Sequence, residues 1–327
     1  MDEEMNYSVV IRTLGTAGEK YQRLLDSLIM QTIKPSEIIV YIADGYPLPK
    51  ETVGVEKYVY VKKGMVAQRA LRYDEVTTEY VLFCDDDILL PTNSVEELYN
   101  TLKGEAADVI SPDVFNNAQR RFGAEMLMTL SGRMRARRFD KIWGYKVMRT
   151  GGYSYNKNPH KSAYRSQTNA GACFFCRKEE FLKIHFEDES WMDAMAYPLG
   201  EDQVMFYKMH CMGLKVLTHY KTGIEHLDAG TGSVNLEREH KLIYSDFYFK
   251  NIFWHRFIYL PESKVLLRIW SVLCLLYPLL FTICVSLIKL NVTVLKVKCH
   301  AIHASWKFIR SKEYEMLPPI IRAEKLR

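Results

Sequence analysis

The sequence predicts an α/β fold, in which helices flank a mostly parallel sheet, followed by a C-terminal helical segment associated with a membrane. Apolar, β-rich runs alternate with segments of helical periodicity, an order typical of strand–helix–strand units. Two of these runs end on aspartates, and a later apolar stretch, residues 265–288, carries a single charge. We therefore expect one α/β domain over residues 1–240 and a helical region over residues 241–327.

Length and composition favour a globular protein. The chain has 327 residues, of which 48% are hydrophobic and 25% are charged, enough for one large or two ordinary domains. Its acidic first residues run into a strand, so we expect no secretory signal. The seven cysteines have no regular spacing, which favours a reducing compartment. Cys173 and Cys176 have redox spacing but lie in an apolar run, which favours core packing.

The elements are expected in alternating order along the first two thirds of the chain. Strands are predicted at residues 7–13, 36–45, 57–62, 80–84, 107–111, 171–177 and 214–220. Helices are predicted at residues 18–32, 66–76, 92–102 and 200–213. Such short intervals imply right-handed crossovers and parallel strands. Residues 112–168 are basic and contain glycine and tyrosine, which indicates a long loop or a small subdomain.

The stretch YVLFCDDDILLP, residues 80–91, places three aspartates directly behind an apolar run. Ligands of open α/β sheets lie beyond the carboxyl ends of the strands. Alternate side chains of an extended chain point to one side, so Asp85 and Asp87 can face one ligand. Carboxylates on a short turn suit Mg²⁺ or Mn²⁺. The alternative is a plain turn or helix cap; a calcium loop would need glycine where Leu90 stands.

With these features in place, the order of landmarks resembles the family 2 glycosyltransferases, whose Rossmann-like GT-A fold binds nucleotide-diphosphate sugars. The resemblance covers about residues 6–230. It rests on Thr13 in the first strand, Asp44 at the end of the second, AQR at 67–69, the DDD element, and ED at 201–202. A single D-x-D is a weak signal, whereas five landmarks in this order are a strong one.

The chain also departs from the family pattern. Arg12 stands where the family often has proline, and AQR replaces A-R-N, so either Gln68 or Arg69 takes the role of the family's arginine. The Q-x-x-R-W box of the processive synthases is absent from the sequence, which favours transfer of a single sugar over polymer synthesis.

The resemblance implies a nucleotide-binding set. Thr13 and Asp44 would hydrogen-bond the base, with uracil favoured, and Asp85 would reach the ribose. Asp86 and Arg69 complete the set that we expect to hold the nucleotide.

The resemblance also implies a metal and a base. Asp87 would bind Mn²⁺ or Mg²⁺ bridging the diphosphate, and His226 is a candidate further ligand, with a structural histidine as the alternative. Asp202 would be the general base of an inverting transfer, with Glu201 as the second candidate. Acids that complement a helix dipole are the alternative for this pair. The Gly-rich residues 228–233 could form a flap over the diphosphate.

The predicted function is therefore metal-dependent transfer of one sugar, from a donor that is favoured to be a UDP-sugar, to a glycan or lipid-linked glycan. Such a reaction belongs to the assembly of a surface polysaccharide or glycolipid. One alternative is a sugar-nucleotide nucleotidyltransferase, although residues 14–23 fit its Gly-rich basic loop weakly. The other is an inactive saccharide-binding membrane protein. We expect no nucleic-acid partner, because the basic stretch lacks a known module.

Positive charge is concentrated in two places. Residues 119–165 hold many more basic than acidic residues, and the chain after Ile288 is also basic. Within the first stretch four arginines are candidates for phosphate contacts, on the donor or on a polyprenyl-diphosphate acceptor. They are Arg133, Arg135, Arg137 and Arg138. A solvated loop is the alternative.

The C-terminal region is expected to hold the enzyme on a membrane. A helix over residues 265–288 is long enough to cross a bilayer, with Pro278 kinking it. Residues 289–310 have a basic face and an apolar face, typical of a helix at a lipid interface. Nucleotide sugars are made in the cytosol, so we expect the cytoplasmic face of the cell membrane. The charge bias favours a re-entrant or shallow helix over a span, and a buried core helix is the alternative.

Overall fold

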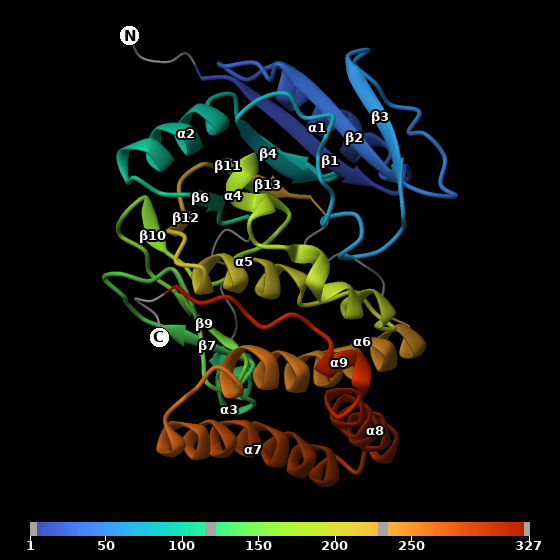
Figure 1. Ribbon diagram of the computed structural model, residues 1–327, viewed down its shortest axis with the longest axis vertical. Coiled ribbons are helices and arrows are strands. Elements are labelled where there is room, and N and C mark those ends of the chain that lie inside the picture. Colours follow the sequence, from blue (N-terminus) through green and yellow to red (C-terminus); the bar gives the residue numbers. More distant parts are fainter. Residues whose placement is uncertain (1–4, 115–121, 228–234, 324–327) are drawn as a thin grey trace.

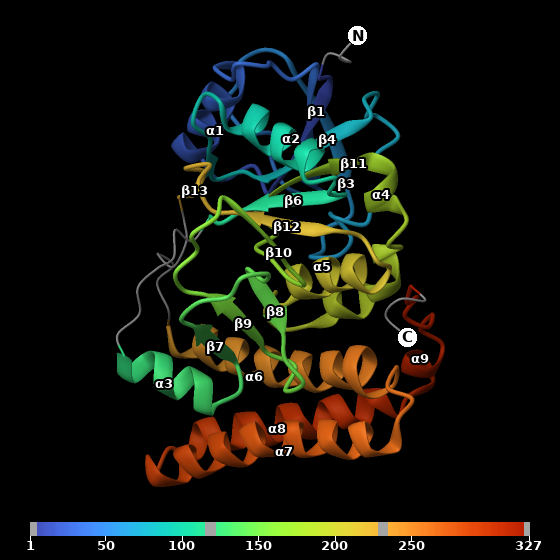
Figure 2. The same cartoon turned by 90° about the vertical axis from the view of Figure 1, so that its left-hand side faces the viewer.

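The computed structural model describes residues 5–114, 122–227 and 235–323, so the predicted flap at 228–233 lies outside the described residues. Figures 1 and 2 show the molecule in layers along its long axis. The large sheet with helices α1 and α2 occupies one end, and helices α7 and α8 lie across the other. Helices α5 and α6 and a small second sheet fill the space between these two ends.

The large sheet contains eight strands within the described ranges, in the order β10-β12-β6-β11-β4-β1-β2-β3. Their bounds are β1 Tyr7–Thr13, β2 Glu37–Ala43, β3 Glu56–Val61, β4 Tyr80–Asp85, β6 Val109–Pro112, β10 Ala163–Arg165, β11 Cys173–Arg177 and β12 Val216–His219. The predicted α/β fold is confirmed. Strands β3, β2, β1 and β4 are parallel, as are β6 and β12. Strand β11 is antiparallel to both neighbours, so the sheet is mixed.

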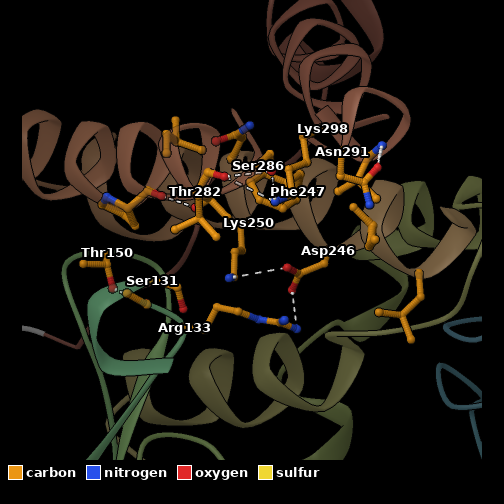
Figure 3. A pocket seen from close by; sticks show the side chains of 18 of the residues that line it. Ser131, Arg133, Thr150, Asp246, Phe247, Lys250, Thr282, Ser286, Asn291 and Lys298 are labelled. Atoms are coloured by element: carbon orange, nitrogen blue, oxygen red, sulfur yellow. Dashed lines mark hydrogen bonds and ion pairs between the residues drawn. The ribbon is translucent and has the colours of Figure 1, made fainter. Parts of the chain in front are cut away.

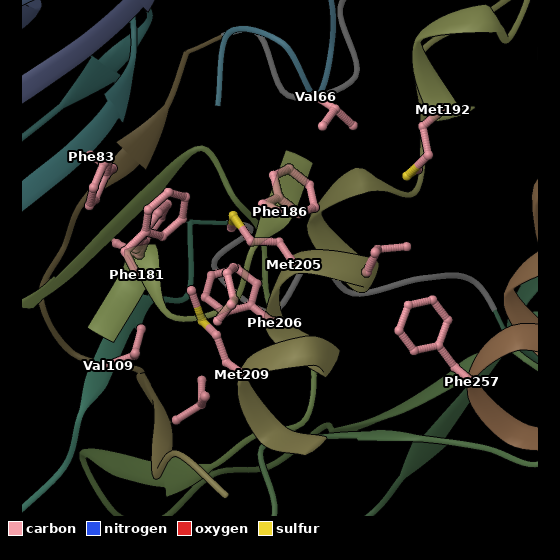
Figure 4. Packing of buried hydrophobic residues seen from close by; sticks show 14 of the residues in the cluster. Val66, Phe83, Val109, Phe181, Phe186, Met192, Met205, Phe206, Met209 and Phe257 are labelled. Carbon is pink, nitrogen blue, oxygen red and sulfur yellow. The ribbon is translucent and has the colours of Figure 1, made fainter. Parts of the chain in front are cut away.

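Helices cover both faces of this sheet. Helices α1 (Glu19–Ile29) and α2 (Ser94–Gly104) pack on one face, and α5 (Glu201–Cys211) packs on the other. Successive strand residues alternate between the two cores, because side chains of a strand point to opposite faces. Leu82 therefore joins the cluster under α1, whereas Phe83 joins the cluster with Met205 and Phe206 of α5, shown in Figure 4. A short helix α4 (Lys178–Leu182) and a 3₁₀ helix (Phe186–Ala194) link β11 to α5.

The predicted helix over residues 66–76 is wrong. The chain makes one turn, in which the amide of Ala70 donates to the carbonyl of Val66 at 2.7 Å, and then leaves the helical path. The buried Tyr73 has a φ of 53° and its hydroxyl donates to the Arg69 carbonyl at 2.6 Å. A left-handed residue of this kind ends an α-helix, because its backbone cannot continue the ladder. Local propensity is overridden here by burial of the tyrosine ring.

Residues 112–168 form a subdomain rather than a loop, as far as they are described. It comprises α3 (Phe122–Leu130), a three-stranded sheet in the order β7-β9-β8, and the edge strand β10. The three strands are β7 Met134–Arg137, β8 Tyr145–Val147 and β9 Tyr153–Asn156. Figure 2 shows the small sheet between the large sheet and the C-terminal helices.

The C-terminal helices are α6 (Leu236–Phe253), α7 (Val265–Ile288), α8 (Val292–Ile309) and α9 (Lys312–Glu315), with a π-helical turn (Trp254–Tyr259) after α6. Helix α7 has the predicted bounds and continues through Pro278. Among the described helices it is the one long and apolar enough to cross a membrane. Phe257, Leu275 and Tyr314 belong to the same hydrophobic cluster as α5, so these helices share a core with the large sheet.

Candidate active site

A cavity of about 510 Å³ opens at the carboxyl ends of β1 and β4, the edge at which α/β sheets bind ligands. We call it the acidic cavity. Its lining residues are Arg12, Thr13, Leu14, Thr16, Ala17, Gly64, Met65, Gln68, Arg69, Asp85, Asp86, Asp87, Pro198, Glu201 and His226. Seven of the nine predicted nucleotide, metal and base candidates, all except Asp44 and Asp202, are thus brought together from five distant segments of the chain.

Arg12 and Asp85 form one wall of the acidic cavity. They are register partners on the parallel strands β1 and β4, so their side chains emerge next to each other. The Arg12 guanidinium forms an ion pair with the Asp85 carboxylate and also donates to the Gly171 carbonyl at 3.3 Å. Burial raises the pKa of Asp85, while Arg12 and Arg69 lower it. Arg12 therefore holds Asp85 in a fixed orientation.

Thr13 fixes the second aspartate. Its hydroxyl donates to the Asp86 carboxylate and accepts from the Gly15 amide at 2.8 Å. Gly15 has a φ of 70°, and a Cβ there would lie 2.0 Å from the Pro47 carbonyl oxygen, so the turn requires glycine. Burial raises the pKa of Asp86 to about 6, although the Thr13 hydrogen bond lowers it. Thr13 and Asp86 form one hydrogen-bonded unit at the end of β1.

Asp87 and His226 form a pair across a short two-stranded ladder. Strand β5 (Ile88–Leu89) follows the aspartates and pairs with β13 (Glu225–His226), so His226 lies opposite Ile88. The His226 Nε2 atom is 3.0 Å from the Asp87 Oδ2 atom. Asp86 and Asp87 lie in a turn, so Asp85 and Asp87 reach the same cavity without the extended geometry that the sequence suggests.

The donor set fits a divalent metal that completes its shell with substrate oxygens. The described residues contain no group of three or more histidine, cysteine, aspartate or glutamate side chains arranged around one metal position. The Asp87–His226 pair supplies two donors on one side of the acidic cavity. Mg²⁺ is usually bound in this way, by one or two carboxylates together with phosphate oxygens of the substrate. Histidine nitrogen next to carboxylate oxygen also suits Mn²⁺.

Arg69 links the acidic cavity to the start of α5. It is 7% exposed, and its guanidinium donates to Glu201 at 2.9 Å and to Asp202 at 3.1 Å. Burial raises the pKa of Glu201 and the adjacent Asp202 raises it further, while Arg69 lowers it. Gln68 lies 3.5 Å from the Thr13 carbonyl oxygen. Both residues line the cavity, and Arg69 is the one that binds the two acids.

Asp202 faces a second space, which we call the acceptor cavity. This cavity has a volume of about 210 Å³. Its lining residues are Tyr145, Tyr153, Thr168, Asn169, Ala170, Gly200, Asp202 and Gln203. A Cβ at Gly171 would lie 2.0 Å from Asp202 Oδ1, so any other residue at 171 would displace the carboxylate. Asp202 thus lines the acceptor cavity, and its ion pair with Arg69 links it to the acidic cavity.

The remaining predicted residues lie elsewhere. Asp44 follows β2 with an exposed side chain and does not line the acidic cavity. The four arginines do not form one cluster. Arg137 binds Asp140 and the Trp143 carbonyl, Arg135 and Arg138 are exposed, and Arg133 lines a different cavity beside α6.

Arg12 is the main functional candidate to which the sequence pattern assigned no role. Its position directly before Thr13 at the end of a strand was the available signal, because the neighbouring parallel strand ends on Asp85. The tyrosines of the acceptor cavity gave no such signal, since they come from the subdomain.

Comparisons with known proteins add little to this geometry. No protein-family model matches the chain, and no curated protein is similar to it in sequence. Among solved structures, the chain is similar to the crystal structure of GalNAc-T7 with UDP, GalNAc and Mn²⁺, with a TM-score of 0.47 and 16% sequence identity. The similarity covers 80% of this chain and 52% of that chain, so this chain spans about half of that protein's length.

Proposed function

We propose that the protein is a GT-A glycosyltransferase that moves one sugar, with inversion, from a nucleotide-diphosphate sugar to a hydroxyl of a glycan or lipid-linked glycan. The observation that carries the proposal is the meeting of Thr13, the three aspartates and His226 with the Arg69–Glu201–Asp202 cluster at one sheet edge. Uridine is the favoured base, and the assembly of a surface polysaccharide or glycolipid is the proposed context.

The donor would lie in the acidic cavity. The hydrogen-bonded unit of Thr13 and Asp86 offers oxygen acceptors to the base and ribose, and Asp85 is held beside it by Arg12. Asp87 and His226 would hold Mn²⁺ or Mg²⁺ against the diphosphate. When bound, such a metal stabilises the negative charge that develops on the departing diphosphate. Without a cation the carboxylates of this cavity would repel the same group.

The acceptor would approach Asp202 from the acceptor cavity. The rings of Tyr145 and Tyr153, whose centroids are 6.1 Å apart, offer an apolar wall against which a sugar face can pack. Asp202 accepts the proton of the attacking hydroxyl as the new C–O bond forms. Arg69 positions Asp202 and offers positive charge on the donor side. One base and one displacement invert the anomeric carbon.

The two alternative functions find less support. A nucleotidyltransferase needs basic side chains from the loop after the first strand. Of the residues of that loop, 14–23, the acidic cavity is lined by Leu14, Thr16 and Ala17, none of which is basic. An inactive sugar-binding protein has no need for a carboxylate in the acceptor cavity that is held by an arginine of the acidic cavity, and Asp202 is such a carboxylate.

Membrane attachment at the cytoplasmic face is part of the proposal, with α7 lying flat rather than spanning. Helix α7 packs on the rest of the protein from end to end: Ser271 accepts from Arg149 at 2.8 Å, and Ser286 accepts from Lys298 at 2.8 Å. Figures 1 and 2 both show α7 running across the end of the molecule. A span would carry these charged partners into hydrocarbon, which is costly.

The outer side of α7 suits a lipid surface. Apart from Arg268 and Cys284, its exposed residues are large and apolar, and Leu266, Trp270 and Leu280 are 81%, 54% and 59% exposed. A contiguous apolar surface of this kind marks an interaction site. The basic side chains of α8 lie next to it in sequence and favour anionic headgroups.

The test is a thermal-shift panel of UDP-, GDP- and dTDP-sugars with Mn²⁺, followed by an assay of nucleoside diphosphate release. One base class should raise the melting temperature in the presence of Mn²⁺, because a ligand of the native state stabilises it by mass action. The same donor should release its diphosphate when a glycan acceptor is added. The proposal fails if no nucleotide sugar stabilises the protein, or if release continues unchanged in excess EDTA.

A further inference from the structure

A third cavity lies between α6, α7, α8 and two turns of the subdomain (Figure 3). Its volume is about 320 Å³, and we call it the basic cavity. Among the described residues it shares no lining residue with the acidic cavity or the acceptor cavity. The proposed sugar transfer leaves this space without a role.

Positive charge dominates the lining of the basic cavity. Four basic side chains and two acidic ones line it: Arg133, Lys250, Lys289 and Lys298, and Glu239 and Asp246. Asp246 forms ion pairs with two of these cations, since its carboxylate is 3.3 Å from Arg133 and 3.5 Å from Lys250. Figure 3 shows these three side chains pointing toward one another.

Lys298 is buried without a negatively charged hydrogen-bond partner. It is 8% exposed, and its ammonium donates to the Ser286 hydroxyl at 2.8 Å and to the Thr282 carbonyl at 3.4 Å. Burial lowers its pKa, and Lys289 and Arg133 lower it further. Burial also lowers the pKa of Lys250 to about 8, despite the attraction of Asp246. An anion in the cavity would relieve this crowding of positive charge.

The other part of the lining of the basic cavity is apolar and belongs to α7, whose outer face is exposed. Leu275, Pro278, Leu279 and Val285 of α7 line the cavity, so one side of α7 walls a cationic space and the other side is apolar and exposed. A ligand that matches both sides carries a compact anion and a hydrocarbon tail. Arginine and lysine together favour phosphate over other anions, because the guanidinium makes paired hydrogen bonds to it.

We infer that the basic cavity binds the phosphate group of a membrane lipid while the outer face of α7 lies among the lipid chains. The inference rests on the membrane attachment proposed above and is independent of sugar transfer. It differs from general attraction to an anionic surface, because the charges converge inside a cavity rather than on an exposed face.

The test compares vesicles of equal surface charge. Full-length protein is sedimented with phosphatidylcholine vesicles that contain either phosphatidic acid, whose phosphate is anionic, or oleic acid, which supplies negative charge as a carboxylate. The phosphate of phosphatidylcholine is neutralised by its choline and is common to both kinds of vesicle. Wild-type protein should prefer phosphatidic acid. Lys250→Gln and Lys298→Gln should each remove most of that preference, a loss of about tenfold in relative affinity for a charge-assisted contact.

A matched control lies on the same helix. Lys296 is exposed on α8 and does not line the cavity. Lys296→Gln removes one charge, so it should weaken binding to both kinds of vesicle equally and keep the preference. Arg133→Gln serves as a second cavity variant, because its side chain is 48% exposed and its replacement leaves the core intact.

Three results would overturn the inference. The first is equal binding of wild-type protein to both kinds of vesicle. The second is a preference that survives in folded Lys298→Gln and Arg133→Gln variants. The third is inorganic phosphate alone raising the melting temperature through Lys298 and abolishing the preference, which would assign the cavity to free phosphate. None of these readouts involves sugar transfer, so failure here is distinguishable from failure of the proposed enzyme activity.

Discussion

The acidic cavity and the basic cavity have opposite charge and are built in different ways. In the acidic cavity four carboxylates face two arginines and a histidine, and three of the carboxylates are consecutive in the sequence. In the basic cavity four cations face two carboxylates, and the cations come from the subdomain, α6, α8 and the turn after α7. If the two proposals hold, each cavity attracts a phosphate group by a different route.

Because the two cavities differ in charge, we expect one to bind phosphate through a metal and the other to bind it directly. A phosphate in the acidic cavity needs a cation between it and the aspartates, so binding there should depend on a metal. A phosphate in the basic cavity meets ammonium and guanidinium groups directly and needs none. The two cavities also differ in surroundings, because one opens at a sheet edge and the other is walled by the apolar helix α7.

The largest expected effect separates chemistry from membrane binding. Asp202→Asn should lower transfer by about 10³-fold or more, because the amide cannot accept the acceptor proton. The variant should still bind the nucleotide sugar and should sediment with vesicles like wild type. Initial rates, donor thermal shift and sedimentation are measured on the same preparation. Normal turnover would assign the base role to another acid, with Glu201 the first candidate.

The next effect concerns the apolar face of α7. Leu266→Glu combined with Leu273→Glu should lower binding to phosphatidylcholine vesicles by about 10²-fold, since each leucine loses roughly 1.5–3 kcal/mol of burial in lipid. Both side chains are exposed, so the fold should persist. Met30→Glu with Leu48→Glu is the matched control, because both residues are exposed and follow α1 and β2, far along the chain from α7. Unchanged binding of the α7 variant would remove this face from the membrane model.

A smaller expected effect is a dependence of the lipid preference on pH. The pKa of Lys250 is about 8, below its ordinary value of 10.5, because burial outweighs Asp246, with Arg133 adding to the decrease. Lys289, Lys298 and Glu239 also face the cavity. As pH rises through 8, Lys250 loses its proton, so the preference for phosphatidic acid should fall by up to about tenfold. In the Lys250→Gln variant this contribution is absent, so any remaining pH dependence of the preference comes from titration of the lipid itself.

The same lysine has the opposite effect on the stability of the ligand-free protein. Between pH 8 and 10.5 the unfolded chain binds more protons at Lys250 than the folded chain does. Its contribution to the free energy of unfolding should therefore rise with pH in this window, by at most about 1.4 kcal/mol per pH unit. Denaturant titrations of wild type and Lys250→Gln would detect this difference. Parallel trends in stability and lipid preference would contradict the account of this cavity.

The sequence predicted the acidic cavity better than the basic one for a physical reason. Asp85, Asp86 and Asp87 are adjacent and end a strand, so their meeting with Thr13 follows from parallel pairing of β1 and β4. Lys250 and Lys298 lie far apart on two helices, and only tertiary packing brings them to the same cavity. The phosphate role of the four arginines stays a prediction, but they do not lie together, because Arg137 is bound by Asp140, which the sequence pattern does not indicate.

The strands were predicted well and the segment at 66–76 was not. Apolar, β-rich runs such as Tyr7–Thr13 and Tyr80–Asp85 are buried in a central sheet except at Arg12 and Asp85, so their pattern is decisive. In the segment at 66–76, Asp193 binds the amides of Val66 and Ala67 at 2.7 and 3.1 Å, and Tyr73 turns inward. Contacts with a distant residue decide that structure.

The central claim is that the acidic cavity binds a nucleotide diphosphate through a metal held by Asp87 and His226. Calorimetric titration of UDP into full-length protein, with Mn²⁺ or with EDTA, tests it most directly. We predict saturable binding with Mn²⁺ to wild type and to Asp74→Asn, an exposed-carboxylate control, and no measurable binding in EDTA or to Asp87→Ala. Equal UDP affinity in EDTA, or in the Asp87→Ala variant, would contradict the claim.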